Sequence, residues 1–112
     1  MAGGLLCGVL DKEPAVGRRT RPQLQARIQE LRPQIEAYEN LCKELGQAPA
    51  DVALAWTLHN PAVTSPIVGP RTLEQLEGNV KALDVELSEA TLKKLDEIWP
   101  GPGNQAPEAY AW

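Results

Sequence analysis

The sequence predicts an α/β chain that is mostly helical and carries one or two short strands. Three features indicate this: a long apolar row at helical spacing, one short run rich in β-branched residues, and a glycine turn that joins this run to a second helical pattern. A lone strand leaves its backbone N–H and C=O groups without partners. We therefore expect it to pair outside this chain, or the chain to be a piece of a larger sheet, as at the end of an α/β fold.

Composition limits the classes of partner. The chain has 112 residues, at most one domain, with 43% hydrophobic and 23% charged residues, which is typical of a globular protein. A net charge of -4 disfavours nucleic acid or an anionic membrane as the main partner, but it permits a small anion held by one Arg and backbone N–H groups. Cys7 and Cys42 have no metal-ligand spacing, so we expect reduced thiols and no metal site. No apolar run is long enough to span a membrane and the glycine-rich start lacks a basic region, so we expect a cytoplasmic protein.

The longest periodic pattern lies in the first half of the chain. Its apolar residues recur at alternating intervals of four and three, which predicts one helical face. Pro33 interrupts the row, so we expect two helices that meet near Arg32 and Pro33, with Gly46 ending the second. The row consists of Leu24, Ile28, Leu31, Ile35, Tyr38, Cys42 and Leu45.

The second half alternates short elements. Residues 50–59 are apolar nearly all round, which predicts a buried helix, and residues 62–68 read as a short strand limited by Pro66. Further helices are expected over residues 73–83 and over residues 89–98, the latter after a Ser88 N-cap. The tail, residues 99–112, begins with a Pro/Gly-rich stretch that excludes regular structure there.

The junction at residues 64–80 is the most informative segment. Exposed N–H groups at a helix start favour an anion, Gly69 permits close approach to the backbone, and Arg71 supplies a planar cation suited to phosphate. On the predicted helix, Arg71, Gln75 and Asn79 share one side, and we expect the apolar row on the other side to pack inward. This row is Leu73, Leu76, Val80 and Leu83. The alternative is a capping box between Thr72 and Gln75 on a solvated face.

The string Ile67-Val68-Gly69-Pro70-Arg71, followed by Glu74-Gln75-Leu76 and Asn79, resembles the segment after the last barrel strand of aldo-keto reductases. The start, Met1 to Gly8, is similar to the segment after the seventh strand of that family, and residues 46–56 and 100–112 also match in order. The ending is close to bacterial members related to the potassium-channel β-subunit branch. The resemblance implies that residues 1–112 are the C-terminal portion of a (β/α)8 TIM barrel, an NADP-dependent oxidoreductase domain.

The resemblance also implies a cofactor site for NADP. Gly69 and Arg71 would lie near the 2′-phosphate, and Gln75 and Asn79 near phosphate and adenine. Backbone N–H groups of the first segment would approach the pyrophosphate; the residues concerned are Gly3, Gly4 and Leu5. Family members often carry an acidic residue just before the Asn, where this chain has Gly78.

No catalytic residue is assigned. The family's Asp, Tyr, Lys and His precede the matching segment, Tyr38 falls on the packed row, and His59 closes a buried helix, where a structural role is expected. We expect a reductase fragment that is inactive alone and binds NADPH weakly or not at all. The start at Met1 is expected to be internal to a longer reductase that reduces a carbonyl substrate. The alternatives are a genuine short protein, either a helical interaction module built on the heptad row or a nucleotide-sensing module.

Overall fold

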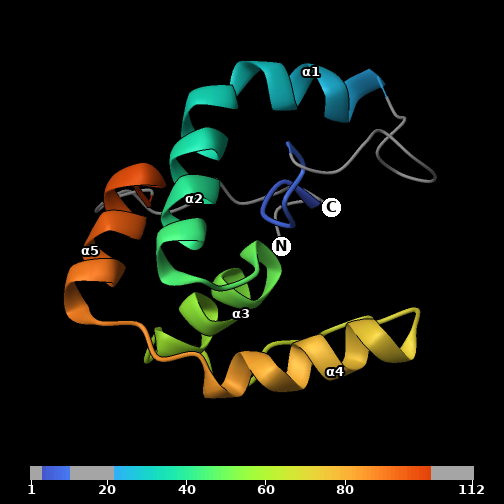
Figure 1. The fold of residues 1–112 in the computed structure, drawn as a ribbon, viewed down its shortest axis with the longest axis vertical. Helices are drawn as coiled ribbons and strands as arrows, with labels where there is room; N and C mark the ends of the chain where they lie inside the picture. Colours follow the sequence, from blue (N-terminus) through green and yellow to red (C-terminus); the bar gives the residue numbers. More distant parts are fainter. Residues whose placement is uncertain (1–3, 11–21, 102–112) are drawn as a thin grey trace, which may run out of the picture.

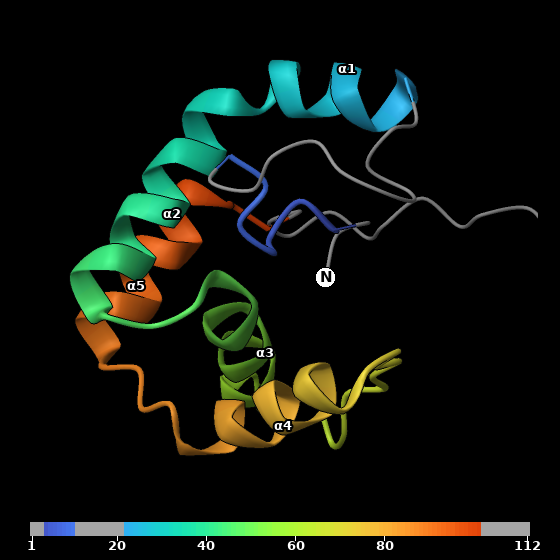
Figure 2. The same cartoon turned by 45° about the vertical axis from the view of Figure 1, so that its right-hand side comes forward.

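The computed structural model describes residues 4–10 and 22–101, and in this part of the chain all regular structure is helical. Helix α2 lies beside α5, α1 meets the start of α2 at an elbow, and α3 lies between α2 and α4 (Figure 1). A view turned by 45° shows the same order (Figure 2). The elements are α1 (Pro22–Glu30), α2 (Arg32–Leu45), α3 (Pro49–His59), α4 (Leu73–Lys81), a 3-10 turn η3 (Ala82–Asp84) and α5 (Glu89–Ile98).

The predicted break in the long apolar row is confirmed. Helix α1 ends at Glu30 and α2 begins at Arg32, with Pro33 in the first turn of α2, where its missing N–H costs no helical hydrogen bond. Gly46 caps α2 in the left-handed region with a φ of 64°, and the N–H of Gln47 donates to the carbonyl of Cys42 at 3.1 Å. The chain therefore turns sharply from α2 into α3.

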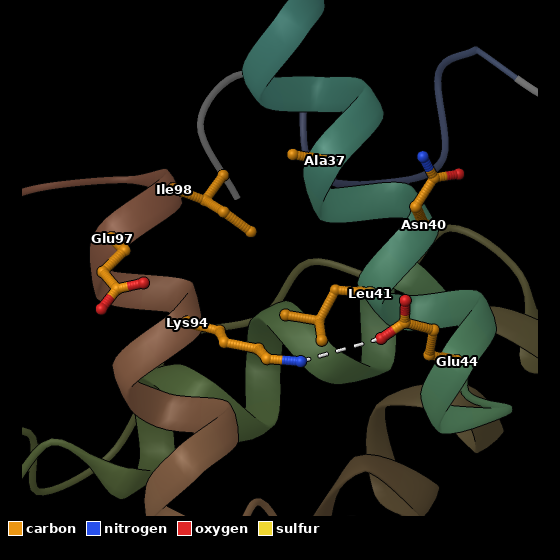
Figure 3. Close-up of a pocket in the computed structure, with 7 residues that line it drawn as sticks. All are labelled: Ala37, Asn40, Leu41, Glu44, Lys94, Glu97 and Ile98. Atoms are coloured by element: carbon orange, nitrogen blue, oxygen red, sulfur yellow. Dashed lines mark ion pairs between the residues drawn. The ribbon is translucent and has the colours of Figure 1, made fainter.

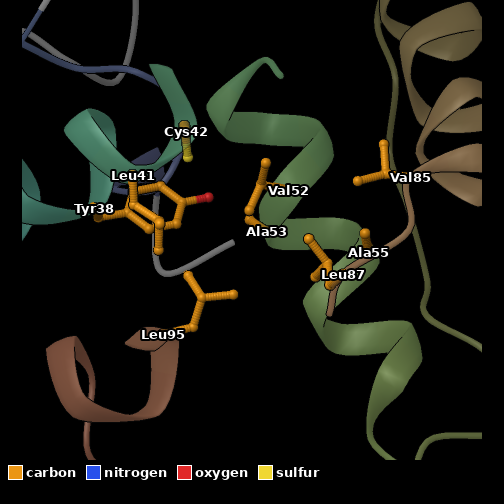
Figure 4. Close-up of a cluster of buried hydrophobic side chains, with 9 residues drawn as sticks. All are labelled: Tyr38, Leu41, Cys42, Val52, Ala53, Ala55, Val85, Leu87 and Leu95. Atoms are coloured by element: carbon orange, nitrogen blue, oxygen red, sulfur yellow. The ribbon is translucent and has the colours of Figure 1, made fainter. Parts of the chain in front are cut away.

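The main core lies between α2, α3 and α5 (Figure 4). The Tyr38 ring lies against Leu41, Cys42 and Leu95, and its hydroxyl donates to the backbone carbonyl of Pro49 at the start of α3. The segment after η3 adds Val85 and Leu87 from the far side of α3. A second cluster joins α1 and α2 to the N-terminal segment; its buried members are Leu5, Ile28 and Ile35. The heptad row is thus an internal packing surface, and it is not available to an external helix.

The expected strand over residues 62–68 is wrong for this chain: the described residues contain no strand, and this segment is an irregular connection. Asn60 begins it with a local turn, in which its side-chain oxygen accepts from the N–H of Ala62 at 3.0 Å. Ile67 is fully exposed, at 102% of its reference area. The physical reason is the absence of a neighbouring strand among the described residues, because strand hydrogen bonds need a second chain segment.

Helix α4 forms where expected, and η3 extends it to Asp84. The inward packing expected of its apolar row is wrong, because all four side chains remain substantially in solvent. Their exposed fractions are 71% for Leu73, 44% for Leu76, 57% for Val80 and 67% for Leu83. Helix α4 contacts α3 through its other side, near Gly78, and its apolar row has no cover among the described residues.

Helix α5 is confirmed at both ends. The Ser88 hydroxyl accepts from the N–H of Thr91 at 3.2 Å, so Ser88 is the predicted N-cap, and the last helical residue is Ile98. Residues 99–101 are irregular, as expected of the tail, and the remainder of the tail lies outside the described residues. In the described part of the chain, no helix is both long and apolar enough to cross a membrane.

Candidate functional site

The start of α4 is built by a reciprocal set of local hydrogen bonds. The Thr72 hydroxyl accepts from the N–H of Gln75 at 3.2 Å, which is the N-cap interaction. The Gln75 side-chain oxygen accepts in turn from the N–H of Arg71 at 2.8 Å. The predicted capping box is therefore present, with Arg71 rather than Thr72 as the backbone donor. Gln75 retains its amide nitrogen as the group that can donate to a ligand.

The start of α4 places one cationic side chain beside the positive end of the helix dipole. Arg71 is exposed, and among the described residues no carboxylate forms an ion pair with its guanidinium. The unsatisfied N–H groups of the first turn add the positive end of the helix dipole, while Glu74 on the same turn opposes it. A methyl group added at Gly69 would meet no atom within 4 Å, so the surface above this backbone is open.

Asn79 lies one turn beyond Gln75 and is half-buried, where α4 approaches α3. The neighbouring Gly78 faces Asp51 of α3, whose Oδ1 lies 3.6 Å from the position that a Cβ on Gly78 would take. Burial raises the pKa of Asp51, and Lys81 opposes that shift. The side chain of Asp51 from α3 therefore lies against the part of α4 that carries Gly78 and Asn79.

The N-terminal segment supplies the other half of the predicted site. Gly4 has a φ of 106°, a conformation that favours glycine, and no atom lies within 4 Å of a Cβ built on it. Leu5 is buried in the second apolar cluster, and the N–H of Cys7 donates to the carbonyl of Gly4 at 3.2 Å. The backbone at Gly4 is thus open to a ligand while the next side chain anchors it. Gly3 lies outside the described residues.

The two halves of the predicted site are separate in this chain. In both ribbon views, α3 lies between the N-terminal segment and α4, and α4 begins at its end farther from α5 (Figures 1 and 2). The structure groups Arg71 with Gln75 through one hydrogen bond and places Asn79 on the next turn. Gly4 and Leu5 belong to a different surface, beside α1 and α2.

A shallow groove of about 320 Å³ lies between α2 and α5, away from both halves (Figure 3). Lys94 reaches across it to Glu44 at 3.9 Å, and Glu97 adds a second carboxylate. With one cation offset by two acidic side chains, this groove does not complement a phosphate. None of the predicted cofactor residues lines it.

The side chains of Tyr38 and His59 both take part in local structural contacts. Burial raises the pKa of Tyr38 far above its usual range, and its hydroxyl is committed to Pro49, so Tyr38 has the packing role that its spacing predicted. His59 bonds through Nδ1 to the carbonyl of Ala55 at 2.8 Å, one turn back in α3, in keeping with a structural role. The described residues also contain no cluster of side chains suited to a metal ion.

The buried carboxylate of Glu39 was not predicted from the sequence. The carboxylate of Glu39, in the middle of α2, accepts from the N–H of Leu10 at 3.2 Å. Its position four residues after Ile35 and three before Cys42, on the flank of the apolar row, is the signal that could have identified it.

The similarity of this chain to known proteins covers nearly all of its residues. The sequence model of the Aldo/keto reductase family matches residues 1–100. The uncharacterized oxidoreductase YrpG of Bacillus subtilis is 50% identical over 112 residues, which is 100% of this chain and 34% of that protein. Norsolorinic acid reductase B of Dothistroma septosporum is 45% identical over 62 residues, 55% of this chain and 16% of that protein. A putative voltage-gated potassium channel subunit beta of Schizosaccharomyces pombe is 40% identical over 67 residues, 58% of this chain and 20% of that protein. The chain thus spans about a third of the Bacillus subtilis relative, and less of the other two.

Proposed function

Because this chain belongs to the aldo-keto reductase family, we propose that it is the C-terminal portion of an NADP-dependent reductase. It carries contacts for the phosphate-bearing parts of the cofactor and none of the residues that transfer protons during carbonyl reduction. The observation that carries this proposal is the start of α4, where an exposed Arg71 without an acidic partner among the described residues adjoins a capped helix N-terminus and an open Gly69 backbone. This combination suits a phosphate monoester.

The exposed row of α4 supports the barrel part of the proposal. Leu73, Leu76, Val80 and Leu83 lie on one side of an amphipathic helix whose opposite side faces α3. An apolar helix face of this kind is normally covered by a sheet or another helix. We infer that the barrel strands supplied by the rest of the reductase cover it. Residues 62–68 become a strand only when those neighbours are present.

The residues fit the cofactor in chemical terms. Arg71 offers a bidentate cation for the 2′-phosphate, and the amide groups of Gln75 and Asn79 offer neutral donors and acceptors for phosphate and adenine. The N–H groups of the glycine segment, Gly3 to Leu5, offer neutral donors for the pyrophosphate. When bound, NADPH supplies the hydride for a carbonyl carbon. This chain's share of the work is to hold and orient the phosphate-bearing half.

The two halves of this site lie apart in the isolated chain, and this separation should lower its affinity for NADPH. Each half alone offers only a few charge-assisted contacts, and binding must also offset the loss of translational and rotational freedom. We therefore propose that the chain alone binds NADPH weakly or not at all, and that the closed barrel brings the two halves to one ligand. Alone it is inactive.

A chimera tests the proposal. In it, residues 1–112 replace the matching 34% of the Bacillus subtilis relative, and nucleotide fluorescence gives the dissociation constants for NADPH and NADH. We expect Arg71→Ala to weaken NADPH about 10- to 100-fold, the loss of one hydrogen bond to a charged group, and to leave NADH nearly unchanged. Lys81→Ala, on the last turn of the same helix, is the matched charge control. An equal loss for both nucleotides, or an equal effect of Lys81→Ala, refutes the role of Arg71.

The competing function, a helical interaction module built on the heptad row, is disfavoured by burial. Ile28, Ile35, Tyr38 and Cys42 all point into the chain's own core. An external helix would have to displace α5 and the N-terminal segment to reach them. Sedimentation of the isolated chain distinguishes the two functions, because a coiled-coil module through this row requires an oligomer and the reductase fragment does not.

A further inference from the structure

The N-terminal segment, residues 4–10, follows an irregular path across α1 and α2. Its first anchor is apolar: Leu5 is buried against Ile28 and Ile35, and Leu6 packs against the main core. Gly8 is also buried and has a φ of 73°. These contacts hold the first half of the segment, where Gly4 leaves the backbone open. At the other end, Val9 and Leu10 are partly buried against the same cluster, and their apolar contacts do not fix the backbone N–H of Leu10.

The second anchor is the carboxylate of Glu39. It accepts from the N–H of Leu10 at 3.2 Å, across 29 positions of sequence. Glu39 is only 2% exposed, and the one other buried polar residue in the described chain is Thr91. Thr91 belongs to the cap of its own helix, beside Ser88. Glu39 has no such local task in the middle of α2.

Burial of a carboxylate is unfavourable unless hydrogen bonds compensate it. An apolar side chain at position 39 would continue the packed face of α2 without this cost, so core packing alone does not account for the residue. The bond to Leu10 does account for it, because a main-chain N–H outside any helix or strand also needs an acceptor once it is covered. The bond therefore serves both groups and fixes one backbone position of the segment relative to α2.

We propose that Glu39 is a positioning residue for the N-terminal segment: with Leu5 at one end and Glu39 at the other, the chain fixes the path of the open Gly4 backbone. That this backbone faces the pyrophosphate rests on the proposed function. Glu39 touches no cofactor atom in this assignment. It acts only through the N–H of Leu10, and its contribution is that the glycine backbone is ordered before a ligand arrives.

Hydrogen exchange on the full 112-residue chain tests the anchor. We expect Glu39→Leu to speed exchange in residues 4–10 at least about tenfold, because the bond to a charged acceptor is lost. Exchange in α5 serves as the internal reference for global unfolding. Glu39→Gln keeps an acceptor oxygen of the same length and is expected to restore most of the protection. Glu36→Leu, which removes a carboxylate from the exposed side of α2, is the matched control.

Three results overturn the assignment: unchanged exchange of residues 4–10 in Glu39→Leu, an equal effect of Glu36→Leu, or equal acceleration of α5 and residues 4–10. If Glu39→Leu does not fold, Glu39→Gln and Glu39→Ala are compared, and the same exchange rates decide. If Glu39 stabilises the whole fold, the faster hydrogen exchange should appear in all helices. If it positions the segment, the faster exchange should be confined to residues 4–10.

A second measurement separates this inference from the proposed function. In NMR spectra of the nitrogen-labelled chain, NADPH added to millimolar concentration is expected to shift the amides of Gly4 and Leu5 and those around Arg71. Glu39→Leu is expected to reduce the shifts at Gly4 and Leu5 at least about threefold and to leave those near Arg71 unchanged, because only the N-terminal anchor is lost. The cofactor role is decided in the chimera, where an equal loss of NADPH and NADH binding in Arg71→Ala refutes it, while the exchange rates of the 112-residue chain decide whether Glu39 anchors the segment.

Discussion

The exposed row of α4 should cost little to remove in the isolated chain and much more in a complete barrel. The double variant Leu73→Ala/Leu83→Ala tests this, since the two side chains are 71% and 67% exposed. Full burial of a leucine side chain contributes about 1.5–3 kcal/mol. The exposed part of each side chain therefore represents about 1–2 kcal/mol that only a covering sheet can realise.

The expected result is a difference between two contexts. In the isolated chain the double variant should lower the free energy of unfolding by about 1–2 kcal/mol, for the part of each side chain that is already buried. In the chimera with the Bacillus subtilis relative, it should cost a further 2–4 kcal/mol or so, because the two positions lie nearly three helical turns apart and their effects should add. Urea denaturation followed by circular dichroism measures both.

Leu95→Ala is the matched control for this experiment. Leu95 is fully buried in the core of the isolated chain, so its loss should cost about 2–5 kcal/mol in both contexts. If the double variant costs the same in the isolated chain and in the chimera, while Leu95→Ala behaves as expected, the row of α4 is not covered by the barrel and that part of the reasoning fails.

Three other variants probe the core and the helix that carries the candidate site. Tyr38→Phe should lower the free energy of unfolding by about 1–3 kcal/mol, because the carbonyl of Pro49 loses its buried donor; an unchanged urea midpoint contradicts this. Gly78→Ala should raise it by about 0.5–1 kcal/mol, because alanine is the better helix former and its Cβ meets Asp51 at an ordinary 3.6 Å; destabilisation would show that the contact with Asp51 is tighter. Burial raises the pKa of Cys42 from 9.0 to about 11, so the unfolded thiol ionises first and stability should fall as pH rises from 9 to 11. Pulse proteolysis across this pH range should show that the stability of Cys42→Ala falls less steeply with pH than that of the wild-type chain. An identical slope would show that Cys42 does not cause the fall.

Local patterns predicted the helices well because their causes are local. Pro33 marks the elbow between α1 and α2, Gly46 ends α2, and Ser88 caps α5, each through a backbone requirement of one or two residues. The buried face of α2 likewise follows from the spacing of its apolar residues. Such features need no knowledge of the rest of the fold.

The strand predicted over residues 62–68 and the inward packing predicted for the apolar row of α4 are the two expectations that the structure contradicts. Both would require a neighbouring sheet, and the described residues contain no strand, so the β-branched composition at Ile67 and the amphipathic spacing at Leu76 indicated surfaces that are uncovered in this chain. In the candidate site, the capping pair Thr72 and Gln75 was readable from the sequence. The distance between the two halves was not, because it depends on tertiary packing.

Glu39 shows a further limit of sequence reasoning. An acidic residue beside an apolar row is usually solvated, and only the three-dimensional path of residues 4–10 brings the N–H of Leu10 to it. Sequence spacing placed Glu39 on the flank of the row, but it contained no sign of a partner 29 positions away.

The irregular connection between α3 and α4 has a consequence for how the isolated chain behaves at high concentration. An exposed segment with β-branched side chains can serve as a template on which a second copy forms intermolecular β-structure. Pro66 and Pro70 interrupt this segment on either side of Ile67, and neither has an N–H to donate to an incoming chain. These two prolines therefore disfavour intermolecular strand pairing along this exposed segment.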